Sequence, residues 1–273
     1  MQTDSISLRT WADKIEEIVR EASKIILNAS QDEMRSEYKS SLKDLVTKYD
    51  VEVQVFIEGR LAKAFPDMGF LGEESGASDI DGYDYIFIVD PIDGTSNFVA
   101  NYKHSGISVA LAKQDGDLVT PVIGVVYNPY LDEMFTAIKG EGTRLNGVLY
   151  TTPDVELDDS LILFGTSPYN RELARPTFQI MEELYHMSRD LRRGGAAVLD
   201  ISYVAVGRRA LFFESQLQVW DYAAAALIVE ESGGVITDLY GNPLTYKNLS
   251  GILAGNKENH NRGLAVIKKY LDA

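Results

Sequence analysis

The sequence predicts a layered α+β protein, because helices and antiparallel strands follow one another in blocks rather than in a strict βαβ alternation. Residues 5–29 place apolar side chains at helical spacing along one face, from Trp11 to Ile26. Residues 106–127 alternate around a "DGD" turn, which is typical of two antiparallel strands. The segment "WDYAAAALIVEESGG" then predicts an apolar helix that ends at a glycine pair. This order argues against both a barrel and a doubly wound parallel sheet.

The rest of the chain divides into elements by the same patterns of apolar residues, proline and glycine. The polar stretch 30–44 is typical of a loop. Strands are expected at 68–72, 83–90 (ending at Asp90), 133–147 (two strands around a glycine turn), 161–166, 234–241 and 251–256. Helices are expected from 47 or 49 to 65, and at 171–188, 196–207 and 261–273. We treat 1–273 as a single domain, with a candidate seam at the acidic stretch 151–159.

The composition restricts the class of function. Lys and Arg number 26 against 41 Asp and Glu, which gives a formal net charge of -15. Such a surface repels nucleic-acid phosphates and anionic membranes, so we expect neither as a partner. The absence of cysteine excludes disulfides, thiolate zinc sites and cysteine nucleophiles. Because the sequence has no signal core and no apolar stretch that could span a bilayer, we expect a cytoplasmic protein.

The stretch "DPIDGTSNF", which begins at Asp90, follows the apolar run "YIFIV" directly. A strand that turns into a helix here would let Asp90 and Asp93 converge, with the Ile92 carbonyl between them. Hard divalent cations such as magnesium take ligands of this kind. The amides of Gly94 and Thr95 would be free to face an anion. The alternative is that these aspartates cap a helix, which explains one of them but not both.

Two further acidic positions are candidates for the same site. Glu73 and Glu74 follow a short apolar run, and Asp221 opens a very apolar helix. However, paired glutamates are common on solvated surfaces, and the helix dipole alone favours an acid in a first turn. On the residues alone, both interpretations stay open.

Taken together, these motifs resemble the inositol monophosphatase family, within the lithium-sensitive, metal-dependent phosphatases. Three motifs carry the likeness, namely "GEES" at 72–75, "DPIDGTSNF" at 90–98 and "WDYAAAALIVEESGG" at 220–234. The segments "KSSLKDLVTKYD" and "RRGGAAVLDISYVAVG" also match in order and spacing, so the likeness covers nearly the whole chain. The resemblance implies an α-β-α-β-α sandwich, a homodimer, lithium inhibition and magnesium-dependent hydrolysis of a small phosphate ester.

The resemblance also implies roles for individual residues. Thr95 and Asp50 match the pair that orients and deprotonates the attacking water, and Glu73 is grouped with them as catalytic. Two or three Mg²⁺ ions per site are implied, with Asp90 as a bridge and Ile92 offering its carbonyl. The implied metal ligands are Glu73, Asp90, Ile92, Asp93 and Asp221.

A second group of positions is implied to meet the substrate. Lys39 would belong to a loop over the site, whereas surface charge is the simpler interpretation of Lys43 and Asp44. The implied substrate contacts are Asp93, Gly94, Thr95, Arg192, Gly195, Ala196, Ala197, Glu214 and Asp221.

Two departures from the family pattern concern the substrate pocket rather than the metal ligands. Ala196 stands where many relatives have serine or threonine, so a side-chain hydrogen bond to the substrate is lost. The turn before Glu214 reads "RRAL", so Arg208 or Arg209 could meet an extra phosphate, although a solvated turn is the simpler interpretation. We assign no catalytic role to the scattered histidines, His104, His186 and His260.

Rival interpretations keep the chemistry and change the substrate to fructose 1,6-bisphosphate, NADP or a 3′-phosphonucleotide. Relatives that act on 3′-phosphonucleotides usually have lysine after the threonine of the central motif, and Ser96 stands there in this chain. A non-catalytic metal or phosphate sensor is a further alternative. It is disfavoured because both Thr95 and Asp50, which are needed only to activate water, are present.

Overall fold

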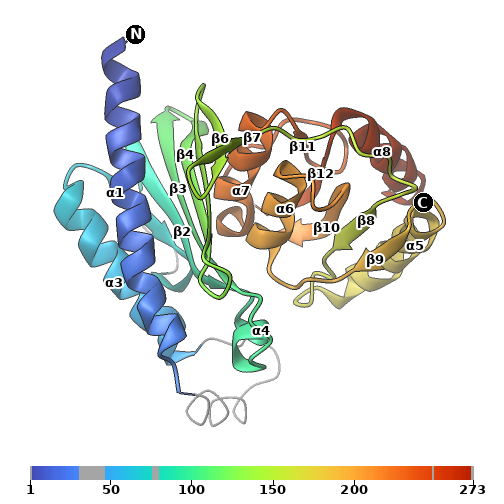
Figure 1. Ribbon diagram of the computed structural model, residues 1–273, viewed down its shortest axis with the longest axis horizontal. Helices are drawn as coiled ribbons and strands as arrows, with labels where there is room; N and C mark the ends of the chain where they lie inside the picture. Colours follow the sequence, from blue (N-terminus) through green and yellow to red (C-terminus); the bar gives the residue numbers. More distant parts are fainter. Residues whose placement is uncertain (1, 31–46, 76–79, 248, 272–273) are drawn as a thin grey trace.

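The computed structural model describes residues 2–30, 47–75, 80–247 and 249–271. Figure 1 shows helices and sheets in five alternating layers, with α1 and α3 outside the first sheet and α5 and α8 outside the second. Helices α6 and α7 lie between the two sheets. The predicted α-β-α-β-α sandwich is therefore confirmed. Lys39, Lys43 and Asp44 lie outside the described residues.

The outer helices α1 (Gln2–Leu27) and α3 (Lys48–Ala64) cover one face of the first sheet. The apolar face predicted for α1 is buried, from Ala12 to Ile26. Helix α3 begins in a capping box, in which Thr47 and Asp50 each accept a hydrogen bond from a backbone amide of the helix start. The structure starts α3 at the predicted place and ends it just before Pro66.

The first sheet has the order β1-β2-β3-β4-β5-β6-β7, and all neighbours are antiparallel except the parallel pair β1 and β2. Its strands are β1 (Gly69–Gly72), β2 (Tyr85–Asp93), β3 (Gly106–Asp115), β4 (Leu118–Asn128), β5 (Glu133–Ile138), β6 (Gly142–Leu145) and β7 (Val148–Tyr150).

Strand β2 continues to Asp93, so the prediction that it ends at Asp90 was wrong. Asp90 pairs with Ser108 and Asp93 pairs with Gly106, which leaves one extra residue on β2 between the two pairs. Pro91 lies in this bulge, where a missing backbone N–H costs no ladder hydrogen bond. The bulge is the bend that aims Asp90 and Asp93 toward one point.

The inner helices α6 (Ala197–Ala205) and α7 (Val219–Glu231) are apolar on nearly all sides because a sheet covers each flank. Their buried residues share one hydrophobic cluster with residues of both sheets. Small side chains allow close packing, since a Cβ on Gly124 of β4 would lie 2.5 Å from the Ala224 carbonyl oxygen of α7. This contact fixes α7, and with it Asp221, against the first sheet.

The second sheet has the order β11-β12-β10-β8-β9. Its central strand β10 was missed from the sequence, because "LFFESQL" places three polar residues in a short run without turn residues beside it. In the segment 234–241, which was expected to be a strand, only Val235–Thr237 are in a strand. The strands are β8 (Leu161–Phe164), β9 (Asp190–Arg192), β10 (Leu211–Leu217), β11 (Val235–Thr237) and β12 (Ser250–Gly255).

Residues 151–156 connect β7 of the first sheet to the approach to β8 of the second and have no regular structure. The candidate seam therefore coincides with the connection between the two sheets. Within the described residues, no helix has the length and apolar composition that a bilayer crossing requires. The remaining helical elements are η1 (Glu73–Ser75), α4 (Thr95–Val99), η2 (Arg171–Leu173), α5 (Ala174–Tyr185) and α8 (Lys257–Leu271).

Candidate active site

Three aspartates from two distant elements meet at the end of β2. One carboxylate oxygen from each of Asp90, Asp93 and Asp221 lies within 4.8 Å of the other two. Asp90 and Asp93 come from the bulge of β2, and Asp221 comes from the first turn of α7. This spacing is that of oxygen atoms around a shared cation.

Glu73 adds a fourth carboxylate to this cluster. Because β1 and β2 are parallel, their carboxyl ends lie at the same edge of the sheet, and Glu73 begins the turn η1 directly after β1. Gln54 of α3 holds this turn, since its Oε1 accepts a hydrogen bond of 2.9 Å from the Glu74 amide. The Glu73 side chain is hydrogen-bonded to Asp90.

The four carboxyl groups are electrostatically unfavourable as a set without a cation. Burial raises the pKa of Glu73 to about 8 and that of Asp93 to about 7. Burial, with repulsion from the neighbouring acids, also raises the pKa values of Asp90 and Asp221 well above the usual range. A cation bound among these groups would offset their repulsion and favour their ionised forms.

Each aspartate is held by a backbone amide. Asp90 Oδ1 accepts from the Ile92 amide at 3.0 Å, and Asp93 Oδ2 accepts from the Val198 amide at the start of α6 at 2.8 Å. Asp221 Oδ2 accepts from the Gln218 amide at 2.8 Å within the capping box of α7. These bonds engage one oxygen of each carboxylate, and oxygen atoms are the donors that a hard divalent cation such as Mg²⁺ prefers. The residues present therefore fit such an ion.

Thr95 and Asp50 lie next to this cluster and contact each other. The Thr95 Oγ1 atom is 3.0 Å from Asp50 Oδ1 and 3.1 Å from the Ile92 carbonyl oxygen. The other Asp50 oxygen accepts hydrogen bonds from the amide and the hydroxyl of Thr47. Burial raises the pKa of Asp50, while its hydrogen bonds to Thr47 and Thr95 oppose that rise.

The turn after β2 packs closely against a second glycine turn. Gly94 has φ of 85°, in the left-handed region that favours glycine, and it caps the short helix α4. A Cβ on Gly94 would lie 3.0 Å from the carbonyl oxygen of Gly195. In the first turn of α4, the amides of Asn97 and Phe98 donate hydrogen bonds to the Gly94 carbonyl oxygen. The amides of Gly94 and Thr95 come before these donors and are not needed for hydrogen bonds within the helix.

Glu214, Ala196 and Ala197 lie on the second-sheet side of the site. Glu214 projects from β10, is buried, and accepts a hydrogen bond of 2.9 Å from the Ser167 amide. Burial raises its pKa to about 7, and the nearby charge of Asp93 adds to the rise. Ala196 and Ala197 start α6, which also supplies the amide that holds Asp93.

Arg192 and Arg208 each pair with an acid outside the carboxylate cluster, and for Arg208 this agrees with the solvated turn favoured from the sequence. Arg192 lies exposed on β9 and pairs with Asp190, so its guanidinium is engaged outside the carboxylate cluster. The adjacent Arg193 is the residue whose charge reaches Glu214. Arg208 donates to Glu133 at 2.9 Å and lies over the Tyr203 ring, which supports a surface role rather than an extra phosphate site.

Sequence reasoning missed several residues that support the site. Gln54 and Asn97 were not singled out, and His104 was given no role. Asp200 was also overlooked, although a lone acid in the apolar segment "AAVLDISYVAVG" was a usable signal. A buried charge within an apolar helix needs partners, and its partners must come from elsewhere in the fold.

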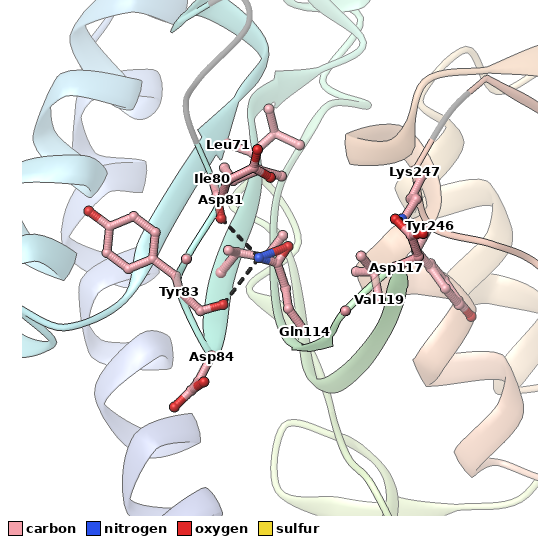
Figure 2. Close-up of a pocket in the computed structure, with 13 residues that line it drawn as sticks. Leu71, Ile80, Asp81, Tyr83, Asp84, Gln114, Asp117, Val119, Tyr246 and Lys247 are labelled. Atoms are coloured by element: carbon pink, nitrogen blue, oxygen red, sulfur yellow. Dashed lines mark hydrogen bonds and ion pairs between the residues drawn. The ribbon is translucent and has the colours of Figure 1, made fainter.

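A separate cavity lies away from the carboxylate cluster. This cavity has a volume of about 560 Å³. Figure 2 shows residues that line it, which come from the start of β2, the tip of the β3–β4 hairpin and the segment with Tyr246 and Lys247. Lys247 and Asp117, which are among its lining residues, form an ion pair of 3.0 Å. The aspartate cluster lies at the opposite end of β2, so this cavity is not part of the acidic site.

The fold and the acidic site match a known family. The model of the inositol monophosphatase family matches residues 7–272. The chain belongs to this family. Members of the family are metal-dependent and bind phosphate esters, and the acidic cluster described above is a candidate place for the metal.

Individual family members resemble the chain over most of its length. Nus factor SuhB of Escherichia coli K12 is 35% identical over 214 residues, which is 78% of each protein. The structure of the extragenic suppressor protein suhB from Bartonella henselae has a TM-score of 0.84 and 31% identity, and the match covers 97% of this chain and 99% of that one.

A third family member is inositol monophosphatase II of Staphylococcus aureus. Its structure with bound inositol monophosphate has a TM-score of 0.73 and 28% identity, with 94% of this chain and 92% of that chain covered. The same protein is also described with 2′-AMP bound, with a TM-score of 0.73 and 30% identity.

Proposed function

We propose that this inositol monophosphatase family member is a magnesium-dependent phosphomonoesterase that hydrolyses an inositol monophosphate. The observation that carries the proposal is the convergence of Asp90, Asp93 and Asp221, with Glu73 beside them, in a buried cluster. Burial, and after it repulsion between the acids, raises the pKa values of Asp90 and Asp221. Glu73, Asp90, Asp93, Asp221 and the Ile92 carbonyl would hold the ions. Bound Mg²⁺ supplies a water of lowered pKa and neutralises charge on the phosphate and on the leaving oxygen.

Thr95 and Asp50 are proposed to prepare the attacking water. The Thr95 hydroxyl donates to the Asp50 carboxylate, so the Thr95 oxygen keeps its lone pairs for a proton from a water beside the cluster. As the water oxygen forms its bond to phosphorus, the bond from phosphorus to the ester oxygen would break and one water proton would move through Thr95 to Asp50. The departing alkoxide would take a proton from solvent, and Asp50 would return its proton to solvent. The raised pKa of Asp50 makes it a better proton acceptor than an exposed aspartate.

The opposite wall of the site is proposed to bind the hydroxylated body of the substrate. Glu214 offers a buried carboxylate to sugar or inositol hydroxyl groups, and the turn at Gly195 with Ala196 and Ala197 offers backbone groups. The amides of Gly94 and Thr95 would contact the phosphate. The Staphylococcus aureus relative described with bound inositol monophosphate supports this choice of substrate.

Other phosphate esters are alternative substrates for the same proposed reaction. The 2′-AMP bound to the Staphylococcus aureus relative supports a nucleotide or NADP as an alternative ester. Fructose 1,6-bisphosphate and 3′-phosphonucleotides complete the set of alternatives. Lithium inhibition, a homodimer and a cytoplasmic location are further parts of the proposal. An activity assay in LiCl would test the inhibition, and analytical sedimentation would test the homodimer.

The name of the Escherichia coli relative supports a second candidate function. A protein similar to a Nus factor could act through a partner without turning over a substrate. The two functions differ in one measurable property, because only the first requires phosphate release that depends on Thr95.

Phosphate release from inositol monophosphates, fructose 1,6-bisphosphate, NADP and 3′-phosphonucleotides tests the proposal. EDTA should abolish release and added Mg²⁺ should restore it. Asp93→Asn should abolish both turnover and Mg²⁺ binding while the protein stays folded, because the change removes a ligand and also a repulsive charge. Asp117→Asn is a matched control on an exposed aspartate outside the cluster. Hydrolysis that survives chelation, or wild-type turnover by the Asp93 variant, would refute the metal assignment.

A further inference from the structure

A buried carboxylate, Asp200, contacts the partly buried His104 beside the glycine turn at Gly194 and Gly195. Asp200, in the first turn of α6, is 2% exposed, and its Oδ1 atom is 2.9 Å from His104 Nε2. Its other oxygen accepts a hydrogen bond of 3.2 Å from the amide of Gly195. Because an ionised carboxylate can only accept, the Nε2 atom of His104 carries the hydrogen in this pair.

The Asp200 carboxylate lies directly against the backbone of the turn. A Cβ placed on Gly194 would be 2.0 Å from Asp200 Oδ1, so only glycine leaves room for the carboxylate there. The next residue, Gly195, has φ of 88°, a conformation that most side chains disfavour. A turn in this conformation needs tertiary contacts to hold it, and Asp200 supplies one.

A second link joins the same turn to the segment that carries His104. The Asn97 side-chain amide donates to the carbonyl oxygen of His104 at 2.7 Å and to that of Gly194 at 2.9 Å. The Cβ position of Gly94 is only 3.2 Å from the His104 carbonyl oxygen. Two segments that are about 90 residues apart in the chain, 94–104 and 194–200, therefore meet beside the residues assigned to phosphate.

Asp200 also influences the site through its charge. After the larger effect of burial, its negative charge also raises the pKa of Glu214. The amide of Val198, two residues before Asp200 in α6, donates to Asp93 Oδ2 at 2.8 Å. Asp200 thus belongs to the helix start that contacts the metal cluster.

We infer that Asp200 and His104 are positioning residues, which fix the Gly194–Ala196 turn in the geometry that receives the hydroxylated body of the substrate. This inference rests on the proposed function for its activity readout. It does not require either side chain to touch the substrate or a metal ion. The simpler alternative is that the pair only stabilises the fold, and the experiment below separates the two.

Asp200→Ala removes both acceptors, whereas Asp200→Asn keeps the shape and one acceptor for the Gly195 amide. His104→Phe removes the donor, and His186→Ala is a matched control on an exposed histidine. Each variant is assayed with inositol 1-phosphate and with p-nitrophenyl phosphate, which lacks ring hydroxyl groups. Thermal unfolding and Mg²⁺ binding are measured in parallel, and amide hydrogen exchange of residues 194–197 is followed by mass spectrometry.

Asp200→Ala and His104→Phe should lower kcat/KM for inositol 1-phosphate roughly a hundredfold, because misplacing a positioning segment by about 1 Å has an effect of that size. The loss with p-nitrophenyl phosphate should be much smaller, and Mg²⁺ affinity should be retained. Asp200→Asn should recover most of the activity, and His186→Ala should match the wild type.

Two results would overturn the inference. One is a loss of kcat/KM that is equal for both substrates and proportional to the loss of thermal stability, which would identify a purely structural pair. The other is unchanged hydrogen exchange at residues 194–197 in Asp200→Ala, because a turn that Asp200 holds must open more often without it. If the wild type hydrolyses neither ester, the proposed function fails, and the exchange measurement still decides whether Asp200 holds the turn.

Discussion

Thr95 has two acceptors for one hydroxyl hydrogen, the Asp50 carboxylate and the Ile92 carbonyl oxygen, at 3.0 and 3.1 Å. A hydroxyl group donates only one hydrogen, so at any moment one of these two oxygen atoms receives no hydrogen bond from Thr95. Asp50 also takes part in the capping box of α3, which fixes its position in the absence of substrate. A single carboxylate thus stabilises a helix start and faces the reacting region.

Thr95→Ala should lower kcat by about 10²–10⁴-fold, the usual contribution of general acid–base catalysis. Mg²⁺ affinity should be unchanged, because the four carboxylates remain. Thr95→Ser is the control that keeps the hydroxyl, and it should retain most of the activity. Steady-state kinetics with calorimetric Mg²⁺ titration would check this, and a parallel loss of turnover and metal binding would contradict the assigned role.

Helix α7 sets the position of Asp221 through its packing on the first sheet. Gly124 of β4 pairs in register with Ala110 on one side and Ala137 on the other, which gives the sheet a row of small residues under the helix. The helix itself presents the buried alanines 223–226 to its surroundings. Close approach of helix and sheet therefore depends on side-chain size at several positions.

Gly124→Ala should destabilise the protein by about 3 kcal/mol, at the upper end of overpacking, because the new Cβ would lie 2.5 Å from the Ala224 carbonyl oxygen. Displacement of α7 should also weaken Mg²⁺ binding through Asp221. Gly59→Ala in α3 is the matched control, since its Cβ meets nothing within 4 Å. It should stabilise the protein by roughly 0.5–1 kcal/mol. A destabilised Gly124 variant with normal Mg²⁺ affinity would show that the two effects are independent.

The whole molecule should show an unusual dependence of stability on pH when metal is removed. Glu73, Asp93, Asp90 and Asp221 all have pKa values raised in the folded state, the first two to about 8 and about 7. In the unfolded chain these groups lose their protons near pH 4, so between about pH 4 and 8 the folded state binds more protons than the unfolded state. Stability in EDTA should therefore fall as the pH rises through this window.

Thermal unfolding in EDTA between pH 5 and 8 measures this effect, and the melting temperature should decrease toward pH 8. Mg²⁺ should reverse the decrease, because it binds only the folded, ionised cluster. Asp93→Asn should flatten the profile by removing one charge. Asp132 and Glu183 form surface ion pairs that lower their pKa values, so their effect on the pH dependence of stability has the opposite sign. A melting temperature that rises toward pH 8 without metal would contradict the account.

At this scale the order of helices and strands predicted a layered α+β protein, and the family resemblance implied the five-layer sandwich. Neither predicted the make-up of the second sheet. Strand β10 is central in that sheet and carries Glu214, yet its sequence alone is as compatible with a loop. Its partner β8 lies about 50 residues before it and its partner β12 about 40 residues after it. A strand that depends on such distant partners has no local signal strong enough to identify it.

Local order in the chain was enough to establish the chemical character of this protein. The three-residue spacing of Asp90 and Asp93 after an apolar strand, the lack of cysteine and the excess of acids all point to oxygen ligands and a hard cation. Folding in three dimensions decided which other acids join them. Glu73 reaches Asp90 because β1 pairs in parallel with β2, and Asp221 reaches it because α7 packs on a row of small residues. Residue identity and short spacing are properties of the chain, whereas the distance between remote carboxylates is set by the burial of apolar faces that belong to separate elements.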